Sequence, residues 1–396
     1  MRPYLWLSSC MYCMNGLSTV VLGTVLPLLI THYGASYTLG GLFVVLQFIG
    51  YLIGVPASAL IVRRHGHRIA IMLAGALIGT AETCIGFLPA PDIAIMMSCL
   101  NGIGLSLMQT TISTSMVEWF EGRRAVIMSR LEAAFGIGCL IIPLLESWLI
   151  AIHAWRIGFF IVGLIAFLFS TASLFIPIKP EERSNEGPRD AYTKVPHIAG
   201  SRAKRLFLSL FLFMIFLYVG VESCINNFFP AIFISYLGRS DSVASLSVTV
   251  FWMSMVIGRA MTGWAIRKVS YPQFLFWSIG SAFMFLMVLA TWRDVNLAYI
   301  ITFFMGLSMS GIFVVTMVYA NHAFPQNGAN VTRLVTIFAG IGGAVIPGLF
   351  GWLMDRLSVV QSLWTLAGFT ILLLFTLTAT VVMGRYRVPI ADQITN

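Results

Sequence analysis

The sequence predicts an all-α membrane protein with twelve transmembrane helices, divided into two related six-helix halves. Hydrophobic residues make up 58% of the 396 residues, and charged residues make up only 10%. The mean hydropathy of +0.89 is far above that of soluble domains, in which about a quarter of the residues are charged. The apolar residues fall into segments of about 20, the length that crosses ~30 Å of hydrocarbon. A soluble globular fold is therefore excluded.

Six apolar segments precede one polar stretch, and six more follow it. The polar stretch, residues 178–205, is too charged to enter a bilayer, and we interpret it as a cytoplasmic linker. The predicted organisation is an N-terminal half (1–177), the linker, a C-terminal half (206–384) and a cytoplasmic tail (385–396). The segments lie near residues 5–30, 38–62, 69–88, 93–117, 125–150, 155–175, 206–236, 245–266, 272–291, 295–320, 331–354 and 363–383.

Lysine and arginine are unevenly distributed between the two sides that these segments define. With the N-terminus on the inner side, 19 of the 24 lysines and arginines lie on or near that side. The positive-inside rule then places both termini in the cytoplasm of a multi-pass protein of the cell membrane. Topology thus explains the pI near 9.5, and no basic patch with interleaved aromatics indicates nucleic acid. The expected partners are a small-molecule substrate and the lipid bilayer, and we expect a monomer.

Sequence signatures of enzymes, ATPases and metal sites are absent. The chain has no G-x-x-x-x-G-K-[ST], no HExxH and no GxSxG. Its six cysteines lie in apolar runs, and Cys10 and Cys13 form a single CxxC without a second pair, so we interpret them as packing residues. We therefore expect no enzyme, no metal and no cofactor, with a proton as the coupling ion.

The two halves are related by a sequence repeat with a constant offset of 204 residues. This offset carries the run 51–54 onto 255–258 and the basic pair at 63–64 onto 267–268. It also carries Gly136, Gly138, Pro143 and Trp148 onto glycine, glycine, proline and tryptophan at 340, 342, 347 and 352. Parallel six-helix repeats are typical of secondary transporters whose substrate site lies between the halves near the midplane.

Several motifs carry a resemblance to a known family. The loop Ala59–Arg68 resembles the G-x-x-x-D-R-x-G-R-R signature of the major facilitator superfamily, with Arg63 at the acidic position. Four stretches are similar to its fucose and glucose to proton symporter branch, specifically the bacterial glucose/mannose members. The resemblance implies alternating access and a polar site between the halves. The four stretches lie within residues 102–111, 129–138, 217–230 and 251–259.

The segment Phe216–Phe233 places a carboxylate and two amides inside an apolar run. Tyr218, Glu222 and Asn226 are spaced at i, i+4 and i+8, so they lie along one stripe of a helix. An ionisable side chain near mid-bilayer indicates a functional site, and burial favours the protonated form of a carboxylate. We therefore predict that Glu222 is the main proton carrier. A structural carboxylate satisfied by neighbouring helices is the alternative.

Glu132 and Arg259 are predicted to lie at the same depth in two different helices. Each is eight residues from a basic residue at the inner edge, Arg124 and Arg267, which corresponds to ~12 Å. The resemblance implies that their helices pack against each other across the interface of the halves. We predict that the two side chains pair there and close an inner gate, with Glu132 also a candidate for proton coupling. A static ion pair is the alternative.

Further polar residues are candidates for binding substrate. Because Gln109 cannot titrate, the resemblance implies sugar-like hydrogen bonding there, without the proton transfer of the glutamate usual in the branch. Amides also hydrogen-bond between membrane helices, and an aromatic ring on a helix often serves packing. Glu82 and Glu146 are expected to serve helix contacts or the outer vestibule. The predicted substrate-binding residues are Gln109, Asn227, Asn226, Trp252, Asn15 and Tyr218.

The predicted function is secondary active transport by alternating access. The favoured substrate is a hexose or a similar neutral polar solute, taken up together with a proton. The alternative is a proton-coupled exporter of drugs or other amphipathic compounds, favoured by 13% aromatic residues and 20 methionines. A membrane receptor without transport or an integral-membrane enzyme is a third possibility, against which the repeat argues.

Overall fold

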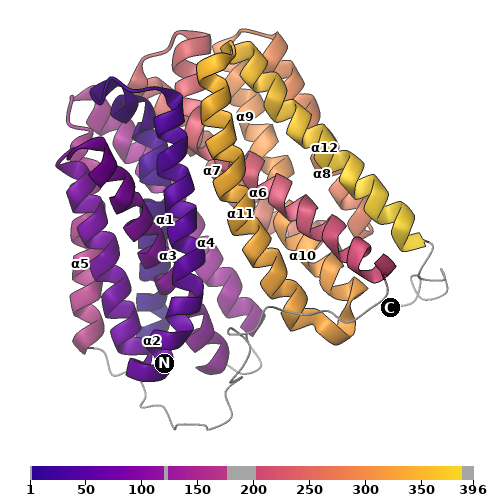
Figure 1. Cartoon of the computed structure of the whole chain (residues 1–396), viewed down its shortest axis with the longest axis horizontal. Helices are drawn as coiled ribbons and strands as arrows, with labels where there is room; N and C mark the ends of the chain where they lie inside the picture. Colours follow the sequence, from indigo (N-terminus) through magenta and orange to yellow (C-terminus); the bar gives the residue numbers. More distant parts are fainter. Residues whose placement is uncertain (1, 120–123, 176–201, 386–396) are drawn as a thin grey trace.

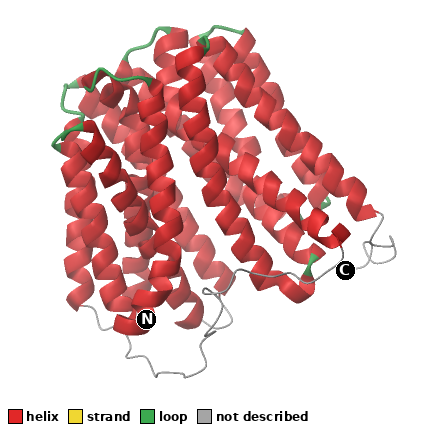
Figure 2. Cartoon of the chain, in the orientation of Figure 1, coloured by secondary structure: helices red, strands yellow, loops and turns green. Residues whose placement is uncertain are grey.

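The computed structural model describes residues 2–119, 124–175 and 202–385, and the regular elements in these ranges are all helical (Figure 2). Figure 1 shows two groups of helices, α1–α5 at the left and α6–α12 at the right. Helix α1 begins and helix α12 ends on the lower side of this view, which we call the terminal side. We refer to the upper side as the opposite side. The helices are α1 (Arg2–His32), α2 (Tyr37–Gly86), α3 (Pro91–Trp119), α4 (Arg124–Ala151), α5 (Arg156–Phe175), α6 (Arg202–Leu237), α7 (Asp241–Ala265), α8 (Tyr271–Thr291), α9 (Val295–Met309), α10 (Ile312–Ala323), η1 (Pro325–Asn327), α11 (Gly328–Arg356) and α12 (Val359–Arg385).

Helix α2 is 50 residues long and contains the second and third predicted segments. Its backbone leaves the helical region at Gly66 (φ 82°, ψ 168°), a conformation that glycine adopts more readily than other residues. Gly102 of α3 packs against the backbone of Gln47, and nearby Gly104 packs against the backbone of Ala74. In a straight helix Gln47 and Ala74 would lie ~40 Å apart. Helix α2 therefore turns back at Gly66 and forms two spans.

The described residues contain 11 helical segments long and apolar enough to span a membrane. Two of the twelve predicted segments are joined in α2. The predicted segment 295–320 corresponds to α9 and α10 together, which form one span, Val295–Ala323. The twelve predicted segments are thus all accounted for.

The predicted domain boundaries are only partly covered by the structure. Helix α6 begins at Arg202, so the last four residues of the predicted linker, 202–205, are helical. Because this end of the linker is rich in helix-forming residues, it extends the first helix of the second half. Residues 176–201 and 386–396 lie outside the described residues, and the assignment of 178–201 as a linker and 386–396 as a tail stays a prediction.

The 204-residue repeat is reproduced in three dimensions. A Cβ atom added to Gly54 of α2 would lie 2.0 Å from the Oγ atom of Ser106 in α3. At the equivalent contact between α7 and α9, a Cβ atom added to Gly258 would lie 2.1 Å from the Oγ atom of Ser310. The same pair of residue types therefore allows close helix packing in both halves.

Contacts between the two helix groups extend from the middle of the molecule to the opposite side. Helix α2 packs on α11, where Gly41 lies against Gly348. Helix α4 packs on α7, where the Ser147 hydroxyl donates a hydrogen bond to the Ser242 carbonyl (2.7 Å). Towards the terminal side the two groups diverge (Figure 1). The structure is thus closed on the opposite side.

At the opposite side, Asp355 of α11 caps the N-terminus of α2. Its carboxylate accepts hydrogen bonds from the backbone N–H groups of Tyr37 (2.7 Å) and Thr38 (2.8 Å). The N-cap residue of α2, Ser36, makes no capping hydrogen bond from its own side chain. The orphan donors of one helix are therefore satisfied by a carboxylate from the other helix group.

The first helix of each half lies at the centre of the molecule. In α1 and α6, 72% and 67% of the residues of the most apolar window are buried, the largest shares among the spans. Most side chains in these windows therefore face protein and not lipid. This arrangement positions the candidate site.

Candidate functional site

The centre of the molecule holds an arginine between two glutamates, which we call the Arg259 triad. Arg259 of α7 places Nη1 3.8 Å from Oε2 of Glu132 in α4, and Nη2 3.8 Å from Oε1 of Glu222 in α6. The side chains are 30%, 44% and 17% exposed, in the order Arg259, Glu132, Glu222. One cation therefore bridges the two halves of the protein.

The triad contains more negative than positive charge when both carboxylates are ionised. Two carboxylates face one guanidinium, which leaves one negative charge uncompensated within the bundle. Because uncompensated charge is costly away from bulk water, one carboxylate is a natural acceptor for a proton. Its protonation would leave a single balanced ion pair.

Trp252 connects the triad to the amide of Asn226. Its Nε1–H group donates a hydrogen bond to the Asn226 Oδ1 atom (2.7 Å). The Arg259 guanidinium carbon lies 5.6 Å from the centre of the indole ring, within the range of a cation–π interaction. Phe135 of α4 meets the same ring edge to face, with the ring centroids 6.0 Å apart. Trp252, which is itself largely buried, thus holds Arg259 in place.

Two tyrosines that the sequence analysis did not single out surround Gln109. The Tyr51 hydroxyl donates a hydrogen bond to the Gln109 Oε1 atom (2.8 Å), and the Tyr12 hydroxyl donates one to the Gln109 backbone carbonyl (3.1 Å). Both hydroxyls lie within electrostatic range of Glu132. The i, i+4 spacing of Gln47 and Tyr51 was a sequence signal for a polar stripe that could have identified Tyr51. Half-buried Gln109 therefore belongs to the first-half wall of the site.

Three predicted substrate-binding residues make helix contacts in this structure, and their role in binding substrate stays a prediction. Asn15 is 1% exposed and donates its amide hydrogen bond to the Leu105 carbonyl of α3 (3.0 Å). Tyr218 is 1% exposed and donates to the Met309 carbonyl (3.0 Å), while interacting with Glu222. Asn227 is buried, with its amide on the Ser223 carbonyl and its Oδ1 atom against α1 at Gly23. The donors of Asn15 and Tyr218 are used in hydrogen bonds to another helix, and the donor of Asn227 is used within α6.

The structure places Glu132 and Arg259 together in a state that is closed on the opposite side. The predicted gate would form when the inner side closes. Here the pair is present while the two helix groups diverge towards the terminal side (Figure 1). Contact between these two side chains is therefore not sufficient to bring the terminal ends of the helices together. A gating role stays a prediction.

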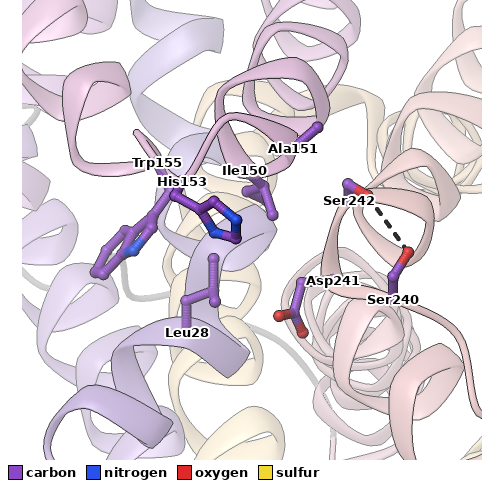
Figure 3. Close-up of a pocket in the computed structure, with 8 residues that line it drawn as sticks. All are labelled: Leu28, Ile150, Ala151, His153, Trp155, Ser240, Asp241 and Ser242. Atoms are coloured by element: carbon purple, nitrogen blue, oxygen red, sulfur yellow. Dashed lines mark hydrogen bonds between the residues drawn. The ribbon is translucent and has the colours of Figure 1, made fainter.

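A pocket of about 310 Å³ lies at the opposite side, between the end of α4 and the start of α7. Figure 3 shows His153 and Asp241 on facing walls of this pocket, with Leu28 of α1 below His153. Residues of both halves line this pocket, and residues of both halves also form the Arg259 triad. The pocket, however, lies on the opposite side, where the two halves are in contact. It is therefore separate from the central site.

The described residues contain no group of three or more His, Cys, Asp or Glu side chains that could hold a metal ion. All six cysteines are free, and Cys10, unlike the other five, is exposed. Within the described ranges, the charged groups at the centre form the ion pairs of the Arg259 triad.

Comparisons with known proteins agree with this architecture. The family model described as Major Facilitator Superfamily matches residues 8–347. The glucose/mannose transporter GlcP of Bacillus subtilis (strain 168) is 27% identical over 352 residues, which cover 88% of this chain and 87% of the relative.

Two solved structures share the fold at low sequence identity. The nucleoside transporter NupG superposes with a TM-score of 0.79 at 12% identity, over 95% of this chain and 98% of that one. A D-xylose-proton symporter superposes with a TM-score of 0.75 at 15% identity, over 97% of both chains. Because the family model covers most of the chain and the helices superpose over nearly all of it, this membrane transporter belongs to the major facilitator superfamily.

Proposed function

We propose that the protein takes up a hexose or a similar neutral polar solute together with a proton. The observation that carries this proposal is the position of Arg259, 3.8 Å from a carboxylate of each half. A central ion-pair network shared by the halves couples their relative position to its own protonation state. Proton binding and alternating access are thereby linked.

Glu222 is the proposed proton carrier, with Glu132 as the second carboxylate of the triad. When Glu222 is protonated, Arg259 keeps one balanced ion pair with Glu132. When the proton leaves, both carboxylates compete for the guanidinium. The energy of the triad therefore differs between the protonated and deprotonated transporter, as coupling requires.

A neutral solute fits the charge of the site better than an anion. With one cation and two carboxylates, the triad repels negative substrates unless it takes up protons. Gln109 and Tyr51 supply hydrogen-bonding groups on the first-half wall, and Trp252 supplies an aromatic ring next to Arg259. Hydroxyl groups of a sugar match such amides, phenols and charged groups.

The relatives support this choice of substrate class. The Bacillus relative is named a glucose/mannose transporter, and one of the similar structures is a D-xylose-proton symporter. We further propose that the terminal side is cytoplasmic, that the protein lies in the cell membrane and that it acts as a monomer. The excess of lysine and arginine on the terminal side supports the orientation.

Sugar-driven proton movement tests the proposal. Purified protein in proteoliposomes, given an outward-to-inward glucose or mannose gradient, is expected to alkalinise the bath, since protons enter with the sugar. Glu222→Gln should reduce this signal at least tenfold, because an amide cannot carry a proton. The matched control is Asp294→Asn, which changes a carboxylate that caps α9 within its own half.

The possible results separate the parts of the proposal. Wild-type protein that moves no protons with any hexose would contradict proton-coupled sugar uptake. If the wild type does move them and Glu222→Gln moves them normally, uptake stands but Glu222 is not the carrier. A similar loss in Asp294→Asn would assign the effect to general damage.

A further inference from the structure

A second group of buried carboxylates lies within the first half, apart from the Arg259 triad. Glu82 of α2 is completely buried. Its Oε1 atom accepts a hydrogen bond from the Ser18 hydroxyl of α1 (2.5 Å) and one from the Asn101 amide of α3 (2.6 Å). Its Oε2 atom is buried and has no hydrogen-bond partner in the part of the chain that the structure describes. One side of this carboxyl group is thus satisfied, and the other is open to a proton.

Glu146 of α4 is buried next to this network. It is also completely buried, and neither carboxylate oxygen has a hydrogen-bond partner within the described residues. The carboxyl group lies directly against the backbone of Gly158, where a Cβ atom would be 1.5 Å from Oε1. Glu146 is close enough to Glu82 for the two to repel each other when charged.

The helices around this pair bring no compensating cation to it. Helices α1 and α3 contribute the neutral Ser18 and Asn101. The nearest described basic side chain on α5, Arg156, directs its guanidinium to the carbonyls of Gly86 and Phe87 at the end of α2. Among the described residues, the one charged group that acts on Glu146 is Glu82, which carries the same charge.

Two charged carboxylates could not remain buried within electrostatic range of each other in this way. Transferring an ionised carboxylate out of water without a partner costs many kcal/mol, and the group takes up a proton or a cation instead. We propose that Glu82 and Glu146 form a second proton-binding site, in which the two carboxyl groups hold at least one proton in this conformation. A proton needs no cavity, whereas Na⁺ would need several converging oxygen ligands, and two donors already point at Glu82.

The opposite-side pocket offers this site a route to solvent. Ile150 lines the pocket and lies one helical turn beyond Glu146 on the same face of α4. The titratable groups His153 and Asp241 line the pocket beside it (Figure 3). Use of the proton at this site in coupling rests on the proposed function, but its binding does not.

Infrared spectroscopy of the full-length protein in lipid tests the proposal directly. At neutral pH the wild type is expected to show the carbonyl stretching band of a protonated carboxyl group. The Glu82→Gln/Glu146→Gln double variant should lose this band, since an amide has no such vibration. Glu222→Gln, in which the second site is intact, should retain a band from it, and Asp294→Asn serves as the control for an exposed carboxylate.

A stability measurement complements the spectra. The native state holds a proton that the denatured chain releases at neutral pH, so the wild-type Tm should fall as pH rises. The double variant should show a smaller fall, with Tm at neutral pH close to that of the wild type or above it. Glutamine has the size and neutral charge of a protonated glutamate, so a double variant that cannot fold would also contradict the proposal.

Two further outcomes would overturn the inference. An unchanged band in the double variant would show that the protonated group lies elsewhere. A wild type that lacks the band and is stabilised by Na⁺ but not by choline would identify a sodium site instead. Neither measurement depends on sugar-driven proton movement. This inference can therefore fail while the proposed function holds, and the proposed function can fail while this inference holds.

Discussion

At the scale of single residues, Arg259 is the side chain on which the central site depends. It interacts with Glu132 of one half, with Glu222 of its own half and with the ring of Trp252. Removing either glutamate leaves a balanced pair, but removing the arginine leaves two facing carboxylates. The three side chains are therefore not equivalent, even though the two distances are equal.

We expect Arg259→Gln to destabilise the protein more than Glu132→Gln or Glu222→Gln. Loss of the cation should cost about 2–3 kcal/mol, below the ~3–5 kcal/mol of a fully buried pair because these side chains are partly exposed. Adding Glu222→Gln to Arg259→Gln should recover part of the loss, since it removes one of the two unpaired charges. Thermal unfolding of the four variants measures this, and strictly additive effects would contradict the triad.

Trp252 allows a second test at the residue scale. Trp252→Phe keeps an aromatic ring beside Arg259 and Phe135 but removes the hydrogen bond to the Asn226 Oδ1 atom. The buried carbonyl oxygen is then unpaired, and we expect a loss of about 1–3 kcal/mol in stability together with weaker hexose binding. Trp252→Phe/Asn226→Leu, which removes both partners, should be closer to the wild type in stability. Equal stability of Trp252→Phe and the wild type would be evidence against the hydrogen bond.

At the scale of elements, glycines set how closely the helices approach each other. Gly138 of α4 lies on the backbone of α1, where a Cβ atom would be 1.9 Å from the Cys13 carbonyl oxygen. Backbone cannot move aside as a flexible side chain can. The close contact of α1 and α4 at this position therefore requires glycine. By contrast, Gly263 of α7 has no atom within 4 Å of its Cβ position.

Gly138→Ala is accordingly expected to separate α1 from α4 and to lower Tm by several degrees, with reduced transport. The matched control, Gly263→Ala, adds the same methyl group in open space. It should be neutral or slightly stabilising, by up to ~1 kcal/mol, because alanine favours a helix over glycine. Thermal unfolding of both variants provides the comparison. Equal Tm values would show that the α1–α4 contact yields easily.

At the scale of the whole molecule, the two halves are held together on the opposite side by a helix cap. Asp355 of α11 accepts hydrogen bonds from Tyr37 and Thr38 at the N-terminus of α2. This contact exists only while the opposite side is closed. Its energy therefore favours the conformation seen here over one that opens on that side.

Asp355→Asn is expected to shift the population towards conformers open on the opposite side. Loss of the cap should destabilise the conformer that is closed on the opposite side by about 1 kcal/mol. This changes the ratio of open to closed conformers about fivefold. Spin labels at positions 32 and 239, on the two sides of the closure, should show more of the longer distance. Asp294→Asn makes the same change at a cap within the second half and should leave the distribution unchanged. An identical response in both variants would show that the cap across the halves has no special role.

Much of the fold and part of the site could be predicted from the sequence, for different reasons. Spans and repeat follow from hydropathy and a constant offset, both properties of the chain alone. Glu132, Glu222 and Arg259 could be selected because charge inside an apolar segment is costly wherever it lies. Tyr51 was missed, and Asn15 was assigned to the substrate, because the partner of a polar side chain depends on which helix faces it. The Leu105 carbonyl beside Asn15 is 90 residues away along the chain.

By itself, the sequence determined that this chain spans a membrane many times, that it repeats after 204 residues and that a few of its charges lie inside apolar segments. Each of these properties can be predicted from the order of residue types alone, because solvation acts on every segment separately. Only the tertiary structure decided that Arg259 serves two carboxylates, that Asp355 caps a helix of the other half and that Glu82 and Glu146 lie within electrostatic range of each other. Such contacts depend on how helices distant in sequence are placed and rotated, which hydropathy does not specify.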